Sequence, residues 1–516
     1  MPLTIGNWLL AIIPVLVVII MMLVFKWSGK QAGAGGLLVA IGIGMLFFGA
    51  GIELIAYTQV KAILLSLDVL YIIWAALLLY NIANEAGAIK LIGERLPRLT
   101  SDKVIQTLLI GWLLVSFLQG MGGFGVPVAI CAPLLVGMGF GPVQAVVMAS
   151  LGHAWAVNFG SLATAFQSLM AVTGLPGEML APASAIMLGV VALPCGMIVA
   201  FIGCGWKGLK RGLPAILILS GVMGAVQYLL ATNGLWTLGA TGAAIAGLLT
   251  CLLLLKLPMY RSDPKVAENS ASVSTDKSKP FLLTLSAYLI LVLLAFATML
   301  IPPVRDFLSQ VKVTLQFPEL ATSRGWVTLA ESGRAINLFG HPGAILLYTS
   351  IISSVIYWRS GYFKPGAMKR IFAGVGRSAV TASLGIITMV SLATVMTHSG
   401  MTNMLARGLS ESFGSNVYPV VAPFIGALGA FITGSNNNSN VLFGVMQQDA
   451  ALLLQLSVPL ILAAQTAGGS IGSIMSPAKV IVGCSTVGLS GKEGSVMRKT
   501  MIYGLIPIVV VAILTT

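Results

Sequence analysis

Long apolar runs alternate with short polar segments along nearly the whole chain. A stretch of about 20 predominantly apolar residues is long enough to cross a bilayer as a helix. The pattern therefore predicts about twelve membrane-spanning helices, near residues 8–25, 33–55, 63–83, 143–173, 181–205, 214–231, 237–257, 281–301, 343–357, 378–397, 457–489 and 501–516. Two further segments, 104–140 and 417–455, contain pairs of shorter helices and predict re-entrant hairpins, since residues 126–140 fall short of a full span.

Small polar residues interrupt this apolar pattern at corresponding places in the two halves of the chain. The first break comprises Gly120-Met-Gly-Gly-Phe-Gly-Val-Pro127 and, downstream, residues 153–161. The second comprises Thr433-Gly-Ser-Asn-Asn-Asn-Ser-Asn440 and, downstream, residues 465–477. Backbone in hydrocarbon must satisfy its own polar groups, so broken helices persist there only where they line a cavity in the protein. Paired breaks of this kind indicate the substrate site of a transporter.

The breaks also contain residues that start helices. Ser476 places a capping hydroxyl before Pro477 at the first helical position, and Pro127 follows the glycine run in the same way. We expect Ser161 and Asn440 to cap the other two half-helices. Four half-helix N-termini would then converge near the bilayer midplane, where their free N–H groups and dipoles favour a small anion.

Glycines in membrane helices often serve only to bring helices close together, and residues 123–125 fit that simpler explanation. The amides of residues 436–440 favour a functional site, because such a cluster is costly to bury in lipid without a cavity or partners. We therefore predict that the substrate is bound by polar and glycine positions of the breaks, namely Gly123, Phe124, Gly125, Asn158, Ser161, Ser435, Asn436, Asn437, Asn438, Ser439, Asn440, Thr466, Ser470, Ser473, Ser476 and Lys479.

Composition supports a membrane protein. Hydrophobic residues make up 57% of the 516 residues and charged residues 9%, with a mean hydropathy of +0.97, whereas roughly a quarter of a soluble domain is charged. Residues 8–25 follow no basic segment and precede no cleavage site, so a retained helix is predicted rather than a signal peptide. The five cysteines form no Cys-x-x-Cys pair, which argues against a disulfide framework or a metal site.

The distribution of basic residues predicts the orientation. With the N-terminus outside, 22 of the 29 basic residues fall in inner loops, as the positive-inside rule requires. Both termini then lie on the outer side of a bacterial-type inner membrane. The two hairpins open to opposite sides, which predicts an all-α polytopic protein built as an inverted-topology repeat. Residues 1–205 form the first repeat and 281–516 the second, and 206–280 supply connecting spans and a polar linker at 258–280.

Several segments of the chain, taken in order, resemble the lactate permease family. They are Gly123-Phe-Gly-Val-Pro-Val-Ala129, Thr433-Gly-Ser435 with Ser439-Asn440, Leu442-Phe-Gly444, Gly468-Gly469, Ile474-Met-Ser-Pro477, Val487-Gly-Leu489 and Gly491-Lys-Glu493. The resemblance covers essentially the whole chain. It implies import of lactate, glycolate or a related 2-hydroxy monocarboxylate, usually with protons, by a fold of inverted repeats with hairpins.

The chain also departs from the family pattern at the expected site. Asn436 stands where the family has an acidic residue, and Gly-Lys-Met-Ile-Ser-Pro-Gln is replaced by Gly472-Ser-Ile-Met-Ser-Pro-Ala478. His153 stands where an asparagine is usual. We expect Lys479, in the first turn after Pro477, to supply the missing cation, because a lysine within a span is costly unless it faces a cavity or an anion. The alternative is that Lys479 extends toward the cytoplasmic interface.

Two residues are candidates for proton coupling. His153 precedes the first gap and has the titration range that coupling requires, although a structural histidine is an equal alternative. Asp68 is the acidic residue deepest in a predicted span, where it either carries the proton or pairs structurally near the outer surface. His341 and His398 lie near predicted span ends, where we expect contact with water or the interface. A sodium-coupled carboxylate symporter is the alternative, since carbonyls and the amides of 436–438 also suit a cation.

Other classes of protein fit less well. A channel would show a ring of filter residues, and an enzyme would show a nucleophile with its base or a set of metal ligands at the breaks. A nucleotide-driven pump would carry Gly-x-x-x-x-Gly-Lys-Ser/Thr, which this sequence lacks. The predicted partners are therefore a small organic anion, a coupled proton or sodium ion and the lipid bilayer, with no cofactor and no nucleic acid.

Overall fold

Helices dominate the computed structural model of the chain, which describes residues 1–25, 27–88, 99–123, 125–260, 283, 286–332, 336–489 and 493–516. In the first half they are α1 (Ile5–Leu23), α2 (Gly29–Leu46), α3 (Ile52–Glu85), α5 (Lys103–Leu108), the π-helix η2 (Leu109–Leu114), α6 (Val115–Gly122), α7 (Val126–Gly137), α8 (Pro142–Gly152), the 3₁₀ turn η3 (Ala154–Ala156), α9 (Thr164–Thr173), α10 (Gly177–Thr232), the 3₁₀ turn η4 (Trp236–Leu238) and α11 (Gly239–Leu254). The second half contains α14 (Ser286–Leu300), α15 (Pro302–Leu308), α16 (Pro342–Arg359), α17 (Ala367–His398), α18 (Met401–Thr433), α19 (Asn436–Leu453), α20 (Val458–Met475), α21 (Pro477–Thr486) and α22 (Glu493–Thr515).

Ten helices of the described part are long and apolar enough to cross a membrane, which is fewer than the twelve or so predicted spans. The span predicted at 33–55 is present as α2, but its bounds are wrong, because α2 ends at Leu46 and α3 begins at Ile52 after a turn at Gly49 (φ 73°). The predicted spans at 181–205 and 214–231 are joined in α10, which kinks at Gly205 (φ 65°). The basic residues between these two segments, Lys207, Lys210 and Arg211, are exposed on the helix. Their charges therefore remain solvated without a loop between the segments.

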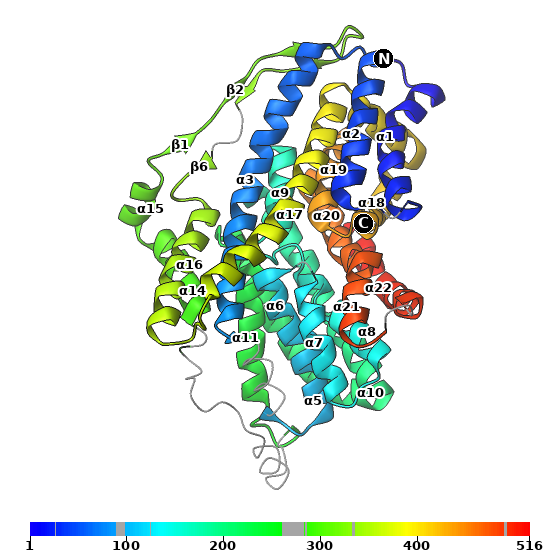
Figure 1. Cartoon of the computed structure of the whole chain (residues 1–516). Coiled ribbons are helices and arrows are strands. Elements are labelled where there is room, and N and C mark those ends of the chain that lie inside the picture. Colours follow the sequence, from blue (N-terminus) through cyan, green and yellow to red (C-terminus); the bar gives the residue numbers. More distant parts are fainter. Residues whose placement is uncertain are drawn as a thin grey trace.

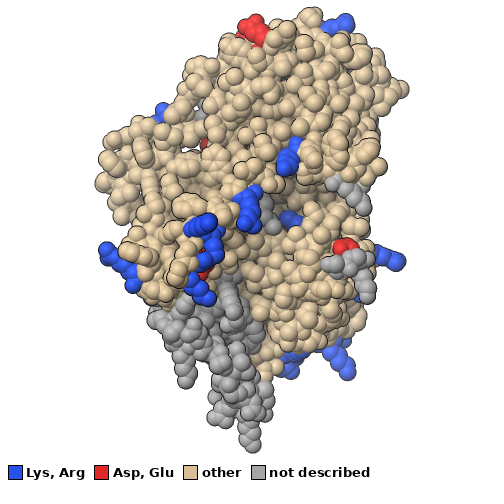
Figure 2. Space-filling model, in the orientation of Figure 1, with Lys and Arg blue, Asp and Glu red and all other residues tan. Residues whose placement is uncertain are grey.

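The outer surface of the bundle matches a multi-pass membrane protein. Large apolar side chains are exposed on several long helices, among them Leu38 of α2 (71%), Ile52 of α3 (77%) and Ile513 of α22 (66%). Much of the face drawn in Figure 2 carries neither acidic nor basic side chains, and basic side chains gather across its middle and lower part. An apolar surface bordered by charge is what a helix bundle in lipid requires.

A β-ribbon between α15 and α16 departs from the all-helical prediction. Short antiparallel pairs join β1 (Lys312–Val313) to β6 (Ile336–Asn337), β2 (Gln316–Phe317) to β5 (Glu331–Ser332), and β3 (Leu320–Ala321) to β4 (Val327–Thr328). The ribbon runs beside the upper part of α3 (Figure 1). Its tip is tied to the α2–α3 turn, where the Ser323 N–H donates to the Gly49 carbonyl at 2.9 Å.

The breaks fall close to where the sequence predicts them. In the first half, α5 to α7 cover the predicted hairpin at 104–140, and α8 with α9 form the broken helix at 143–173. In the second half, α19 and the end of α18 cover 417–455, and α20 with α21 cover 457–489. The re-entrant character of the hairpins and the inverted relation of the halves stay predictions, because helix bounds alone do not place helices in a bilayer. The predicted linker lies outside the described residues from position 261 onward.

Close backbone packing holds α18 against α20 and so positions the second break. Gly426 of α18 faces Gln465 of α20, and Gly468 of α20 faces Pro423 of α18. A Cβ at either glycine would collide with the facing carbonyl. Small residues therefore allow the approach of the two helices, as is common in membrane bundles.

Candidate functional site

A small cavity of about 200 Å³ lies where the two breaks meet. Its lining comes from the ends of α6, α9, α18, α19 and α21 and from the segment between η3 and α9, and comprises Gln119, Val157, Ser161, Thr164, Gly434, Ser435, Asn436, Asn437, Ala478, Lys479 and Val482. Cavities for drug-sized ligands usually measure about 300–1,000 Å³. The central cavity, as we call it, therefore suits a ligand of only a few heavy atoms.

Helix starts surround the central cavity. Helix α19 starts after Ser435, whose Oγ accepts from the Asn438 N–H, and α21 starts after Ser476, whose Oγ accepts from the Lys479 N–H, both at 3.5 Å. The predicted cap at Ser476 is confirmed. The predicted cap at Asn440 is wrong, because that residue lies inside α19. The predicted cap at Ser161 is also wrong, because α9 begins three residues later, at Thr164, and its N-cap is Ala163.

Backbone strain explains why Ser161 does not cap α9. Ser161, Leu162 and Ala163 all adopt left-handed φ angles of 46°, 60° and 62°, a conformation that costs an L-residue roughly 1–2 kcal/mol. The strained segment is held by α6, because the Ser161 N–H donates to the Gln119 carbonyl at 2.7 Å. Gly123 (φ 32°) packs against Ser161, and a Cβ there would collide with the Ser161 Oγ. Strain retained in this way is typical of functional sites.

The hydroxyl of Thr466 joins the two breaks behind the central cavity. It donates to Asn158 Oδ1 at 2.6 Å and accepts from Asn440 Nδ2 at 2.8 Å and from Asn436 Nδ2 at 3.2 Å. Asn436 Nδ2 also reaches Ser470 Oγ at 3.1 Å. Asn158, Asn440, Thr466 and Ser470 are fully buried and do not line the cavity. These four predicted residues therefore support the site rather than form its surface, and only Asn436 belongs to both groups.

The remaining predicted residues fall into two groups. Ser161, Ser435, Asn437 and Lys479 line the central cavity together with Asn436. Others pack around it: Ser439 donates to the Gly426 carbonyl at 2.7 Å, Asn438 lies beside Gly29 of α2, and Gly125, the N-cap of α7, lies beside Val482. Phe124 lies outside the described residues.

Lys479 points into the protein rather than toward a lipid interface. Its Nζ donates to the Oγ of Ser473 at 3.0 Å, and Ser473 is fully buried in α20. The lysine starts from α21 and returns across the break to the last turn of α20. Its ammonium group thus supplies a positive charge at a cavity that is otherwise lined by amides, hydroxyls and apolar groups.

The two coupling candidates lie in different places. His153 is buried (1% exposed) at the end of α8, its Nδ1 donates to the Ala149 carbonyl at 2.7 Å, and the charge of Lys479 acts on its ring. Asp68 is equally buried in α3, where its Oδ1 accepts from His341 Nε2 at 3.1 Å. The Gly343 N–H donates to His341 Nδ1 at 3.2 Å, which places the ring proton on Nε2.

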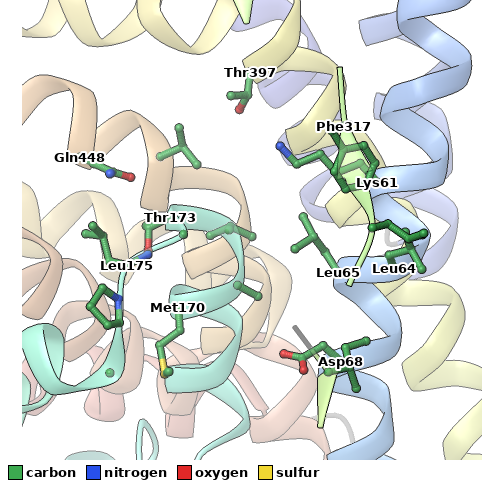
Figure 3. A pocket seen from close by; sticks show the side chains of 18 of the residues that line it. Lys61, Leu64, Leu65, Asp68, Met170, Thr173, Leu175, Phe317, Thr397 and Gln448 are labelled. Atoms are coloured by element: carbon green, nitrogen blue, oxygen red, sulfur yellow. The ribbon is translucent and has the colours of Figure 1, made fainter. Parts of the chain in front are cut away.

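Asp68 lines a second and larger cavity of about 640 Å³, shown in Figure 3. Its walls are α3, α9 with the α9–α10 turn, η4, α17, α19 and the β-ribbon. Lys61 of α3 lies 5.7 Å from the ring centroid of Phe317 and 3.3 Å from His398 Nε2. The expectation that His341 and His398 lie at the membrane interface is wrong, because they are only 6% and 5% exposed, and His398 instead lines this cavity.

Sequence reasoning missed six residues of the central cavity, namely Gln119, Val157, Thr164, Gly434, Ala478 and Val482. Gln119 directly precedes the first glycine run, and this position is the signal that an analysis of the break could have used. Val482 lies one helical turn after Lys479, so helical spacing places the two on one face of α21. The sequence carries no comparable signal for Val157 and Thr164. The direction of their side chains depends on the left-handed backbone segment between them.

Known proteins resemble the chain over its full length. The family model for L-lactate permease matches residues 7–516. An L-lactate permease of Salmonella typhimurium is 27% identical over 540 residues, covering 99% of this chain and 96% of that protein. The glycolate permease GlcA of Escherichia coli K12 is 30% identical over 541 residues, covering 98% and 94%.

A solved structure supports the fold. The YdaH transporter of Alcanivorax borkumensis superimposes with a TM-score of 0.54 over 95% of this chain and 98% of that chain, at 14% sequence identity. At this identity the likeness concerns the arrangement of helices only. The family model, in contrast, covers nearly every residue, including both breaks and Lys479. The chain therefore belongs to the L-lactate permease family.

Proposed function

We propose that the chain is a secondary transporter that imports a small 2-hydroxy monocarboxylate, lactate or glycolate, together with a proton. Family membership and the relatives named as L-lactate permease and glycolate permease support the substrate class. The observation that carries the proposal is the ammonium of Lys479 at a cavity of about 200 Å³ lined by amides and hydroxyls. One positive charge and short polar groups match one carboxylate and one hydroxyl.

The substrate carboxylate binds beside Lys479 in this proposal. An ammonium group has three N–H donors, and Ser473 accepts one of them at 3.0 Å, so the group keeps donors for an anion. The first turns of α19 and α21 direct further N–H groups and dipoles to the same place. The side chains of Asn437 and Ser161 line the cavity and suit the 2-hydroxyl group.

The position of Lys479 accounts for a departure from the family pattern. The resemblance implies a lysine where this chain has Ser473, and the Lys479 ammonium lies within hydrogen-bonding distance of that serine. The positive charge thus occupies a similar place but comes from the other half-helix. We infer that the exchange of positions preserves the anion site.

The neighbourhood of Lys479 and His153 supports the proposal of proton coupling. Because His153 Nδ1 donates to a carbonyl, Nε2 is the atom that takes up a proton. An anion beside Lys479 offsets the charge that acts on this ring, so anion binding favours proton binding, and by linkage the reverse also holds. Asp68 is the second candidate and lies at the larger cavity. Sodium is the alternative coupling ion.

We propose that the protein works in a bacterial inner membrane with both termini outside. Residues 1–205 and 281–516 act as inverted repeats, and one structural unit moves against the other to alternate access to the central cavity. The contacts between Asn158 and Thr466 support this idea, because they join the two breaks at one place. Movement of one unit about the contact between Asn158 and Thr466 would expose the central cavity to each side of the membrane in turn.

Uptake into proteoliposomes tests the function. We expect saturable accumulation of labelled lactate or glycolate against its gradient when a proton gradient, acidic outside, is imposed. Accumulation driven by sodium alone would replace the proton by sodium in the proposal. Uptake that never exceeds equilibrium would indicate a channel, and no uptake of either acid would refute the substrate assignment.

A further inference from the structure

The central cavity has an apolar side that the proposed binding of carboxylate and hydroxyl leaves without a role. Val157, Ala478 and Val482 form it. Ala478 and Val482 are four positions apart on α21 and so lie on one face of that helix. Lys479 lines the same cavity from the same turn. A molecule held at the ammonium group therefore meets apolar side chains in the next turn of the helix.

Val482 is 38% exposed, and one side of it packs against the tip of the first break. A Cβ on Gly125 would lie 3.3 Å from Val482 Cγ1, so the valine packs closely against the backbone at the start of α7. Lys479 and Val482 are separated by three residues, or about 4.5 Å along the helix axis at 1.5 Å per residue. Val482 therefore lies within one helical turn of the residue that carries the ammonium group, and both line the same cavity.

We propose that Val482, together with Val157, sets the chain-length limit of the substrate. The carbon end of a 2-hydroxy acid packs against the two isopropyl groups once its carboxylate lies at Lys479. Glycolate does not reach them, the methyl group of lactate contacts them, and a longer alkyl group collides. This inference rests on the proposed function and adds the residues that determine which acid is preferred.

The expected effect is large enough to measure. One methylene group in an apolar pocket changes kcat/KM by roughly 10- to 200-fold. Val482→Ala removes two methyl groups from the wall, so we expect the ratio of 2-hydroxybutyrate to lactate transport to rise at least tenfold. Val482→Leu extends the wall, so the ratio of lactate to glycolate transport should fall.

The experiment measures kcat/KM for glycolate, lactate and 2-hydroxybutyrate in proteoliposomes that contain the full chain. Ile481→Ala is the matched control, because Ile481 is the neighbour of Val482 on α21, is 51% exposed and does not line the central cavity. We expect this control to keep the wild-type ratios. Val157→Ala enlarges the same wall from the other break and should raise the ratio for 2-hydroxybutyrate even if a Val482 variant fails to fold.

The outcomes separate this inference from the proposed function. Wild-type protein that transports none of the three acids refutes the proposed function. Wild-type transport with ratios that stay within about twofold in Val482→Ala and Val157→Ala overturns the inference and leaves the function intact. A changed ratio in Ile481→Ala equal to that in Val482→Ala also overturns it, because the effect would then not arise at the cavity wall.

Discussion

Replacing Lys479 by glutamine removes the positive charge at the central cavity while keeping a side chain of similar length. In the wild-type protein the ammonium lies 3.0 Å from Ser473 Oγ. That hydroxyl also donates to the Ser470 carbonyl at 3.0 Å, so it keeps a partner in the variant. The substitution therefore acts on the ligand more than on the fold.

The expected loss of affinity in Lys479→Gln follows from the loss of a charged hydrogen bond to the substrate carboxylate. Such a bond contributes about 1.5–3 kcal/mol, and about 1.4 kcal/mol corresponds to a tenfold change in affinity. We expect Lys479→Gln to bind lactate or glycolate roughly 10- to 100-fold more weakly than wild type. The measurement is calorimetry or ligand-dependent thermal shift on purified protein.

A double variant serves as the matched control. Lys479→Ser combined with Ser473→Lys moves the positive charge to the other side of the break, and its binding should recover part of the loss. Binding of Lys479→Gln with wild-type affinity would show that helix ends and amides hold the anion without the lysine. The reasoning about the exchanged positions would be refuted if the double variant bound no better than Lys479→Ser alone.

Three further predictions concern the surroundings of the cavity. Asn440→Ala should lose most uptake and still insert into membranes, because Asn440 Nδ2 bonds Ala165 and Thr466 at 3.0 and 2.8 Å. Asn438→Ala should also lose uptake, because Asn438 lies in the first turn of α19 beside the cavity-lining Asn437. Normal affinity in both purified variants would contradict this. His153→Asn should abolish substrate accumulation driven by a pH gradient and preserve substrate exchange across the membrane. Asp68→Asn should keep proton-driven accumulation and lower thermal stability. Wild-type proton-driven accumulation in His153→Asn would exclude His153 as the coupling residue. Gly123→Ala should destabilise the protein by at least about 1 kcal/mol, because its φ is left-handed.

Control variants use residues of the same type away from the cavity. Gly137→Ala lies at the end of α7, where a Cβ would meet nothing within 4 Å, so its melting temperature should stay near that of wild type. Asn233→Ala removes an exposed amide at the end of α10 and should leave uptake unchanged. Equal losses in the control and the site variant would show that the effect is not specific to the cavity.

Local sequence signals predicted the broken helices well. The predicted segments 143–173 and 457–489 correspond to helices that span 142–173 and 458–486, because polar runs, prolines and caps act within a few residues. The helix that joins 177 to 232 and the β-ribbon at 312–337 were not predicted. Charged residues on an exposed helix face look like a loop in a hydropathy pattern, and the ribbon is paired between residues up to 25 positions apart.

The sequence by itself determined the membrane class, the positions of the two breaks and the cap at Ser476, since each depends on composition or on neighbours along the chain. Only the tertiary structure decided which polar groups face the cavity. Asn158 and Thr466, 308 positions apart, bond to each other, while Asn437 and Lys479 face the open space. The direction of a side chain depends on the packing of helices that are distant in sequence, and this packing turned Lys479 toward Ser473 and placed Val482 at the cavity wall.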